Sequence, residues 1–131
     1  MKMLAIAFFA TCVFLPSALS QGDDCSTLES CQAMLKANPK SSLALFRIGE
    51  MYFEQQNGYA AANMFREARN GDLSPKWVKL CARINLGKIC DAHNQRNRAV
   101  NEYTHAIGTT DNTRGAQEEA AKYIKTPFRR P

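Results

Sequence analysis

The 131-residue sequence predicts an all-α fold in which antiparallel helix-turn-helix units stack as a short solenoid of about six helices. Two observations support it. Residues 44–68 align without a gap with residues 82–106 when the sequence is shifted by 38 positions. Asparagine, glycine and proline also divide the chain into segments of helical length, and none of these segments has the alternating pattern of a strand.

Residues 1–20, MKMLAIAFFATCVFLPSALS, are predicted to be a cleaved secretory signal. Lys2 precedes an apolar run from Leu4 to Leu15, and the small-residue exit ends at Ser20. The run is shorter than the about 20 apolar residues of a transmembrane helix. We therefore expect cleavage after Ser20, an exported protein (periplasmic or secreted), and no stable membrane span once the signal is removed.

The remaining residues 21–131 are expected to form one helical domain. A leading helix is predicted over 26–37, because Asn38-Pro39 stops it. The first hairpin is predicted over 42–70 and ends at Asn70-Gly71. The second is predicted over 74–108, with Ser74 as its cap, Pro75 in its first turn and Trp77 early in a lengthened first helix.

A final helix is predicted over 112–125, with Asp111 as its cap and Pro127 after its end. Ala116, Ala120, Tyr123 and Ile124 share one face of it, as expected for a helix that caps the end of a stack.

Each hairpin repeats one pattern: an apolar residue and glycine, then alanine, an aromatic residue and alanine at fixed spacings. Small residues at these positions let two helices approach closely, and the aromatic ring fills the space one turn further on. The pattern residues are Gly49, Ala61, Phe65 and Ala68 in the first copy, and Gly87, Ala99, Tyr103 and Ala106 in the second.

These residues resemble the tetratricopeptide repeat (TPR), whose pattern places Leu-Gly, Tyr, Ala and Phe at the same spacings. The first copy also matches at Leu45, Ile48 and Tyr52, and the second at Leu86. The second copy departs from the pattern at Arg83 and Cys90, lacks the closing proline, and follows after 38 residues instead of the usual 34. The resemblance implies an exported bacterial TPR protein whose flanking helices complete the core.

The resemblance also implies a mode of action, because the first helices of successive TPR units line a groove that takes a peptide or a partner's helix. The candidate groove residues are Leu43, Phe46, Glu50 and Phe53 on the first copy, and Cys81, Ile84, Lys88 and Asp91 on the second. An alternative is that Phe46 and Phe53 only pack against the leading helix. The carboxylate clamp of some family members is incomplete here, since the corresponding positions are mainly Phe46, Arg47, Glu50, Ile84, Asn85 and Lys88.

Four cysteines follow the predicted signal, and an exported chain meets conditions in which disulfides persist. Cys81 and Cys90 fall nine residues apart on one predicted helix, about 13.5 Å, which is too far for a bond. We expect both to be free thiols in a buried setting. Cys25 and Cys31 can bond only if Cys25 lies in extended chain before the leading helix, and the sequence leaves that open.

The sequence contains no catalytic motif, so we expect a protein that is not an enzyme, with no cofactor and no metal. Basic residues are scattered except at 96–98 and in the final FRRP, so no nucleic-acid partner is expected. The predicted function is a non-catalytic protein-protein interaction scaffold or adaptor that binds another protein. The alternative is a small thiol- or metal-dependent protein that uses Cys81, Cys90 and His93.

Overall fold

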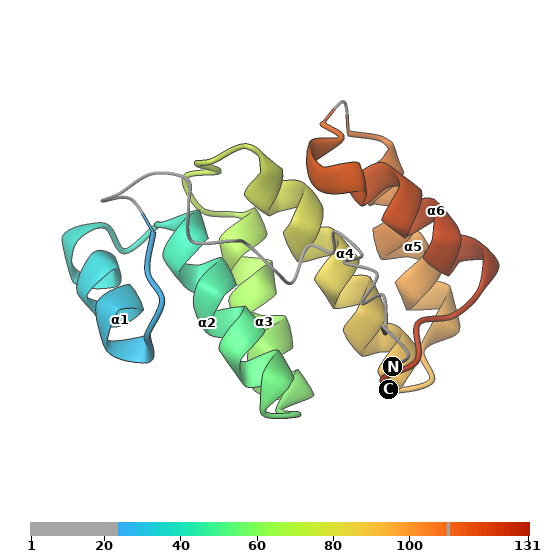
Figure 1. The fold of residues 1–131 in the computed structure, drawn as a ribbon, viewed down its shortest axis with the longest axis horizontal. Helices are drawn as coiled ribbons and strands as arrows, with labels where there is room; N and C mark the ends of the chain where they lie inside the picture. The colour runs from blue at the N-terminus through green and yellow to red at the C-terminus, as the bar shows by residue number, and fades with distance from the viewer. Residues whose placement is uncertain (1–23, 110) are drawn as a thin grey trace, which may run out of the picture.

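The computed structural model describes residues 24–109 and 111–131, and in these ranges the regular structure is helical, with no strand (Figure 1). The helices are α1 (Leu28–Ala37), α2 (Ser42–Glu54), α3 (Gly58–Arg69), α4 (Trp77–Ala92), α5 (Arg96–Ile107) and α6 (Ala116–Lys125), with a short 3₁₀ turn at Thr113–Gly115. The all-α prediction is confirmed. Among the described residues, no helix has the length and apolar character needed to cross a membrane. The predicted signal, residues 1–20, lies outside the described ranges.

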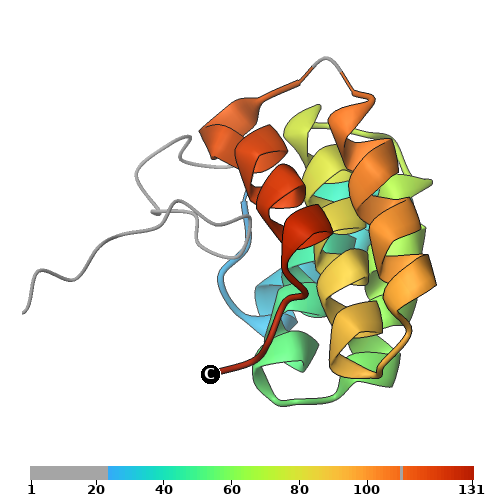
Figure 2. The same ribbon diagram turned by 90° about the vertical axis from the view of Figure 1, so that its right-hand side faces the viewer.

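The helices form two layers (Figure 2). Helix α4 contacts both α2 and α6, and these three helices make one layer. Helix α3 packs against α2 and α4, and α5 packs against α4 and α6, so α3 and α5 make the other layer. Helix α1 packs against α2 at one end of the row.

The two hairpins share the same close approach, as the repeated pattern predicts. A Cβ atom added at Gly49 would lie 2.7 Å from Cε1 of Phe65, and one added at Gly87 would lie 2.7 Å from Cδ1 of Tyr103. Both rings are fully buried. Each glycine therefore makes room for the aromatic ring of the helix that follows it, and the equivalence of the two copies extends to atomic contacts.

Helix α4 is longer than α2, 16 residues against 13, which confirms the predicted extension, but it does not begin where predicted. Its cap position is Lys76, which provides no side-chain hydrogen bond. Ser74 instead belongs to the preceding connection, because Asp72 Oδ1 accepts both the Ser74 N–H and the Ser42 N–H at 3.1 Å. Asp72 thus fixes the connection to the start of α2. The predictions that Ser74 caps the helix and that Pro75 lies in its first turn are wrong, because α4 begins at Trp77.

The outer helices also begin later than predicted. Helix α1 starts at Leu28 because Thr27 accepts the Ser30 N–H and forms a capping box with it, which leaves Ser26 outside. Helix α6 starts at Ala116 because Gly115 has a left-handed backbone, φ 67°, that interrupts the helix. Asp111 does cap a turn, since its Oδ1 accepts the Thr113 N–H at 2.8 Å, but this is the 3₁₀ turn before α6.

Helix α6 matches α4 at a few positions when the 38-residue shift is applied a second time. Shifting the register of α4 by a further 38 residues places Ala120 on Ala82 and Ile124 on Leu86, and Phe128 falls on Cys90. Ala44, Ala82 and Ala120, the equivalent alanines of the three helices, are all fully buried. Helix α6 therefore lies in the same layer as α2 and α4 and buries an alanine at the equivalent position.

Candidate functional site

The predicted groove residues lie on neighbouring helices of one layer, and we refer to them together as the α2/α4 face. Its members are Leu43, Phe46, Glu50 and Phe53 from α2, and Cys81, Ile84, Lys88 and Asp91 from α4. Six of the eight are buried, whereas Phe53 and Asp91 are half-buried.

The apolar members of this face are part of the main core. The Phe46 ring lies 5.4 Å from the Phe65 ring and 5.3 Å from the Trp77 ring, centroid to centroid. Leu43 and Ile84 belong to the same apolar cluster. These three side chains hold α2 and α4 together, and the ring neighbours of Phe46 come from α3 and the start of α4.

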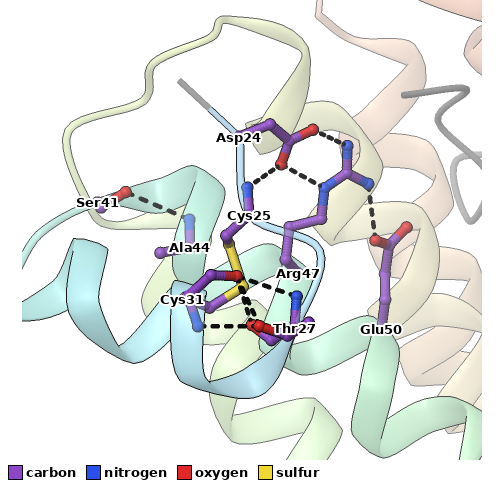
Figure 3. The surroundings of a disulfide bond; sticks show 9 residues. Asp24, Cys25, Thr27, Cys31, Ser41, Ala44, Arg47 and Glu50 are labelled. Carbon is purple, nitrogen blue, oxygen red and sulfur yellow. Dashed lines mark hydrogen bonds and ion pairs between the residues drawn. A yellow bond between two sulfur atoms is a disulfide. The ribbon is translucent and has the colours of Figure 1, made fainter. Parts of the chain in front are cut away.

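A polar cluster lies over the middle of α2, and a disulfide brings it there (Figure 3). Cys25 and Cys31 are bonded, with their Cα atoms 5.1 Å apart, and Cys25 lies in extended chain before α1, as the bond requires. The disulfide packs against Ala44 and Ile48 of α2. It therefore turns the chain back over α2 and places Asp24 next to that helix.

Asp24, Arg47 and Glu50 form a chain of charged hydrogen bonds in this cluster (Figure 3). The Arg47 guanidinium donates from Nε and Nη2 to the two Asp24 oxygens at 3.0 and 2.7 Å, and from Nη1 to Glu50 Oε2 at 2.8 Å. Burial lowers the pKa of Arg47, but the hydrogen bonds to Asp24 and Glu50 outweigh it and raise the pKa overall. Arg47 therefore remains a cation.

Glu50 has a different balance. Burial raises the pKa of its carboxyl to about 7, and the hydrogen bond from Arg47 offsets this only in part. Its second oxygen, Oε1, is buried and has no hydrogen-bond partner. Glu50 is thus a carboxyl that changes charge near neutral pH.

Asn85 follows Arg47 by 38 residues and occupies the equivalent position on α4. Its side chain is buried, and neither its amide nitrogen nor its amide oxygen has a hydrogen-bond partner. Arg47 already binds two carboxylates of its own chain. Arg47 and Asn85 therefore do not together form a clamp for the carboxylate of a partner.

The far end of the face is covered by residues 126–131, which we call the post-α6 segment. Asp91 Oδ2 accepts the Phe128 main-chain N–H at 2.9 Å, and the Phe128 ring lies 6.2 Å from the Phe53 ring. The Arg130 guanidinium lies 4.5 Å from the centroid of the Phe53 ring and donates a hydrogen bond to the Phe53 carbonyl oxygen. Repeat spacing predicted Phe53 and Asp91 for this end of the face but gave no indication that the chain itself covers them.

Lys88 lies beside this segment and is almost fully buried. Its Nζ is 2.5 Å from Glu119 Oε1, 5.6 Å from the Tyr123 ring centroid and 5.5 Å from the Phe128 ring centroid. The ion pair and the two aromatic faces stabilise a cation that burial alone would disfavour. Lys88 therefore joins α4, α6 and the post-α6 segment.

Asp91 organises this end of the face. Besides the Phe128 N–H, it accepts the Tyr103 hydroxyl at 2.9 Å and Arg96 Nη1 at 3.1 Å. Burial and the nearby Asp91 raise the pKa of Tyr103, so its hydroxyl remains a donor. These hydrogen bonds hold the Asp91 carboxylate in a fixed position, and one of the donors is the main chain of the post-α6 segment.

The thiol and metal candidates are dispersed. Cys90 is a free, half-buried cysteine, and burial raises the pKa of its thiol. Cys81 is fully buried and is not a free thiol, so that expectation is wrong for Cys81. His93 ends α4, where Nδ1 lies 2.8 Å from the Ile89 oxygen. Within the described ranges, no group of three or more His, Cys, Asp or Glu side chains is placed to hold a metal ion.

Comparison of the chain with protein-family models, with curated proteins and with solved structures finds no match.

Proposed function

We propose that this protein is an exported, non-catalytic scaffold of TPR-like repeats that binds an extended segment of another protein on the α2/α4 face. One observation carries the proposal: a peptide segment already lies on that face. The post-α6 segment contributes a main-chain hydrogen bond to Asp91 and two side chains against Phe53. These are the kinds of contact by which helical-repeat surfaces hold extended peptides.

The stacking of repeats supports the same proposal. The glycine–aromatic contacts Gly49–Phe65 and Gly87–Tyr103 are equivalent, and α6 continues the register of α2 and α4. Stacked units with first helices in one layer present a continuous face, which single hairpins do not. A short TPR-like solenoid is the arrangement that these features favour.

Export is the second part of the proposal, and it predicts a specific N-terminus. Sequencing of the protein isolated from its native host should read QGDDC, because cleavage is expected after Ser20. The presence of a disulfide at Cys25–Cys31 agrees with an oxidising compartment. Recovery of the exported protein with Met1 still in place would contradict the proposed signal.

The binding face predicts the effect of Phe53→Ala. Phe53 is half-buried at the edge of the main apolar cluster, and its aromatic and cation–π contacts are with Phe128 and Arg130 of the post-α6 segment, so truncation should leave the helical circular dichroism near wild type. Aromatic anchors at an interface often contribute about 2 kcal/mol, or roughly thirtyfold in affinity. We therefore expect capture of the partner in the native host to fall by about that factor.

The capture is measured with a photo-crosslinking residue at exposed Arg129, next to the face, and with the same residue at Tyr59 as the control. Tyr59 is 80% exposed on α3, in the other layer. A defined adduct from position 129 but not from position 59, reduced by Phe53→Ala, supports the proposal. Adducts from position 59 alone would place the partner on the other layer, and unfolding by Phe53→Ala would make the ring a core residue.

A further inference from the structure

The post-α6 segment has the contacts of a bound ligand more than those of a core element. Pro127, Arg129, Arg130 and Pro131 are exposed, and only Phe128 is half-buried. The segment leaves α6 and runs toward the end of α2 (Figure 2). Its contacts are with side chains of α2, α4 and α6 and with the carbonyl group of Phe53.

Three features of the site on which this segment lies, called the seat below, favour a particular peptide chemistry. The first is an aromatic slot: the Phe128 ring lies 6.2 Å from the Phe53 ring and 5.4 Å from the Tyr123 ring, the latter edge-on, and the Lys88 ammonium lies 5.5 Å from it. Ring contacts from two helices and a cation on the ring favour an aromatic residue over an aliphatic one.

The second feature is a fixed acceptor for the main chain. Asp91 Oδ2 accepts the N–H of the same aromatic residue, and Tyr103 and Arg96 hold the carboxylate in place. A main-chain anchor of this kind requires an extended segment at the slot.

The third feature is a cation site at the end of α2, which terminates at Glu54. The Arg130 guanidinium donates to the Phe53 carbonyl and lies over the Phe53 ring. The C-terminal end of a helix carries partial negative charge, so a cation is stabilised there. Arg129, the residue between them, is exposed, so the spacing is aromatic, any residue, arginine.

We propose that the seat formed by Phe53, Lys88, Asp91 and Tyr123 is a recognition subsite for an extended partner segment of the pattern aromatic-x-Arg, and that the chain's own Phe128 and Arg130 occupy it in the partner's absence. This inference rests on the proposed function and gives the partner's chemistry. A segment tethered by two residues to α6 competes at an effective concentration of about millimolar. A partner must therefore displace it, and the apparent affinity equals the intrinsic affinity multiplied by the fraction of molecules in which the segment has left the seat.

The test uses the full chain and a fluorescein-labelled peptide with the sequence of residues 126–131, TPFRRP, as the probe. Peptide binding is measured by fluorescence anisotropy to wild type, to Phe128→Ala/Arg130→Ala, and to the matched control Arg129→Ala. We expect the double variant to bind the probe at least tenfold more tightly than wild type, because its seat is empty. Arg129→Ala should bind the probe as wild type does.

Substitutions in the probe give an independent readout. Replacing its phenylalanine or its second arginine with alanine should reduce binding to the double variant at least tenfold, and replacing its first arginine should not. Arg130→Ala alone, whose lost contacts are at the surface, provides a folded variant if the double variant loses its circular dichroism, and it too should bind the probe several-fold more tightly than wild type.

Absence of probe binding to every variant, or equal binding to all of them, would overturn the inference. A concentration-dependent dimer in size-exclusion chromatography that requires Phe128 would also overturn it, because the occupant would then be a second copy of the chain. If partner adducts still form from position 129 but the peptide does not bind, the aromatic-x-Arg pattern is wrong. The proposed binding face is then still supported. Adducts from position 59 alone would contradict the proposal that the partner binds the α2/α4 face.

Discussion

Replacing Gly87 with leucine is expected to lower the free energy of unfolding by at least about 3 kcal/mol, the upper end of the range for overpacked cores. Even a single Cβ at this position would lie 2.7 Å from Cδ1 of Tyr103. The ring cannot withdraw, because it is fully buried and its hydroxyl is hydrogen-bonded to Asp91. The gain from removing a helical glycine, about 1 kcal/mol, does not compensate. Urea denaturation followed by circular dichroism measures the loss.

Gly108→Leu is the matched control. Gly108 has an ordinary helical backbone, and the nearest atom to an added Cβ is the His105 carbonyl oxygen at 3.5 Å, which is normal contact. The same substitution there should change the free energy of unfolding by no more than about 0.5 kcal/mol. A smaller side chain in place of the ring, as in Tyr103→Leu, should recover part of the stability that Gly87→Ala loses. Equal losses at Gly87 and Gly108 would show that the glycine–aromatic contact does not control the packing.

The helices and the hairpin core follow from the sequence because their determinants are local and repeated. Gly49 and Gly87, each followed at a fixed interval by alanine and an aromatic residue, specify one packing arrangement twice. The helix starts were less predictable. Ser74 is a residue type that often caps helices. Asp72, however, accepts the main-chain N–H groups of both Ser74 and Ser42, and this tertiary contact outweighs the local preference.

The covering of the α2/α4 face was not predictable from local pattern. The contacts of Phe128 and Arg130 join residues 37 and 77 positions apart, and nothing in FRRP specifies where it lies. One signal was present, since a second shift by 38 residues puts α6 in register with α4 and carries Phe128 to the position of Cys90. The short α6 pattern read alone predicts only a capping helix.

Charge on the α2/α4 face is set by burial in a way that the sequence does not reveal. Repeat spacing places Glu50 and Lys88 at equivalent positions, and both would be ordinary exposed ions on a solvated helix. In the fold, Lys88 keeps an ion pair with Glu119, whereas Glu50 has one oxygen bound by Arg47 and one buried without a hydrogen bond. The two equivalent positions therefore differ in their partners, and burial raises the pKa of Glu50.

Glu50→Gln is expected to remove a pH dependence of stability that the wild-type protein has between about pH 4.5 and pH 7. Burial raises the pKa of Glu50 from 4.5 to about 7, so in this window the folded protein keeps a proton that the unfolded chain releases. The unfolded state then binds fewer protons, and the free energy of unfolding falls as pH rises. The shift corresponds to a loss on the order of 3 kcal/mol across the window, at 1.36 kcal/mol per pKa unit.

The measurement is the difference in free energy of unfolding between Glu50→Gln and wild type, taken from pH 4 to pH 8.5. Other titrating groups are common to both proteins and cancel in the difference, which should therefore move in favour of the variant by about 3 kcal/mol as pH rises, and level off above pH 7. Glu67→Gln, an exposed carboxylate on α3 in the other layer, is the control and should give a flat difference. A flat difference for Glu50→Gln as well would mean that the Glu50 carboxyl is already ionised at pH 5. Arg47 would then hold it as a full ion pair, and the α2/α4 face would carry the same charge throughout the neutral range.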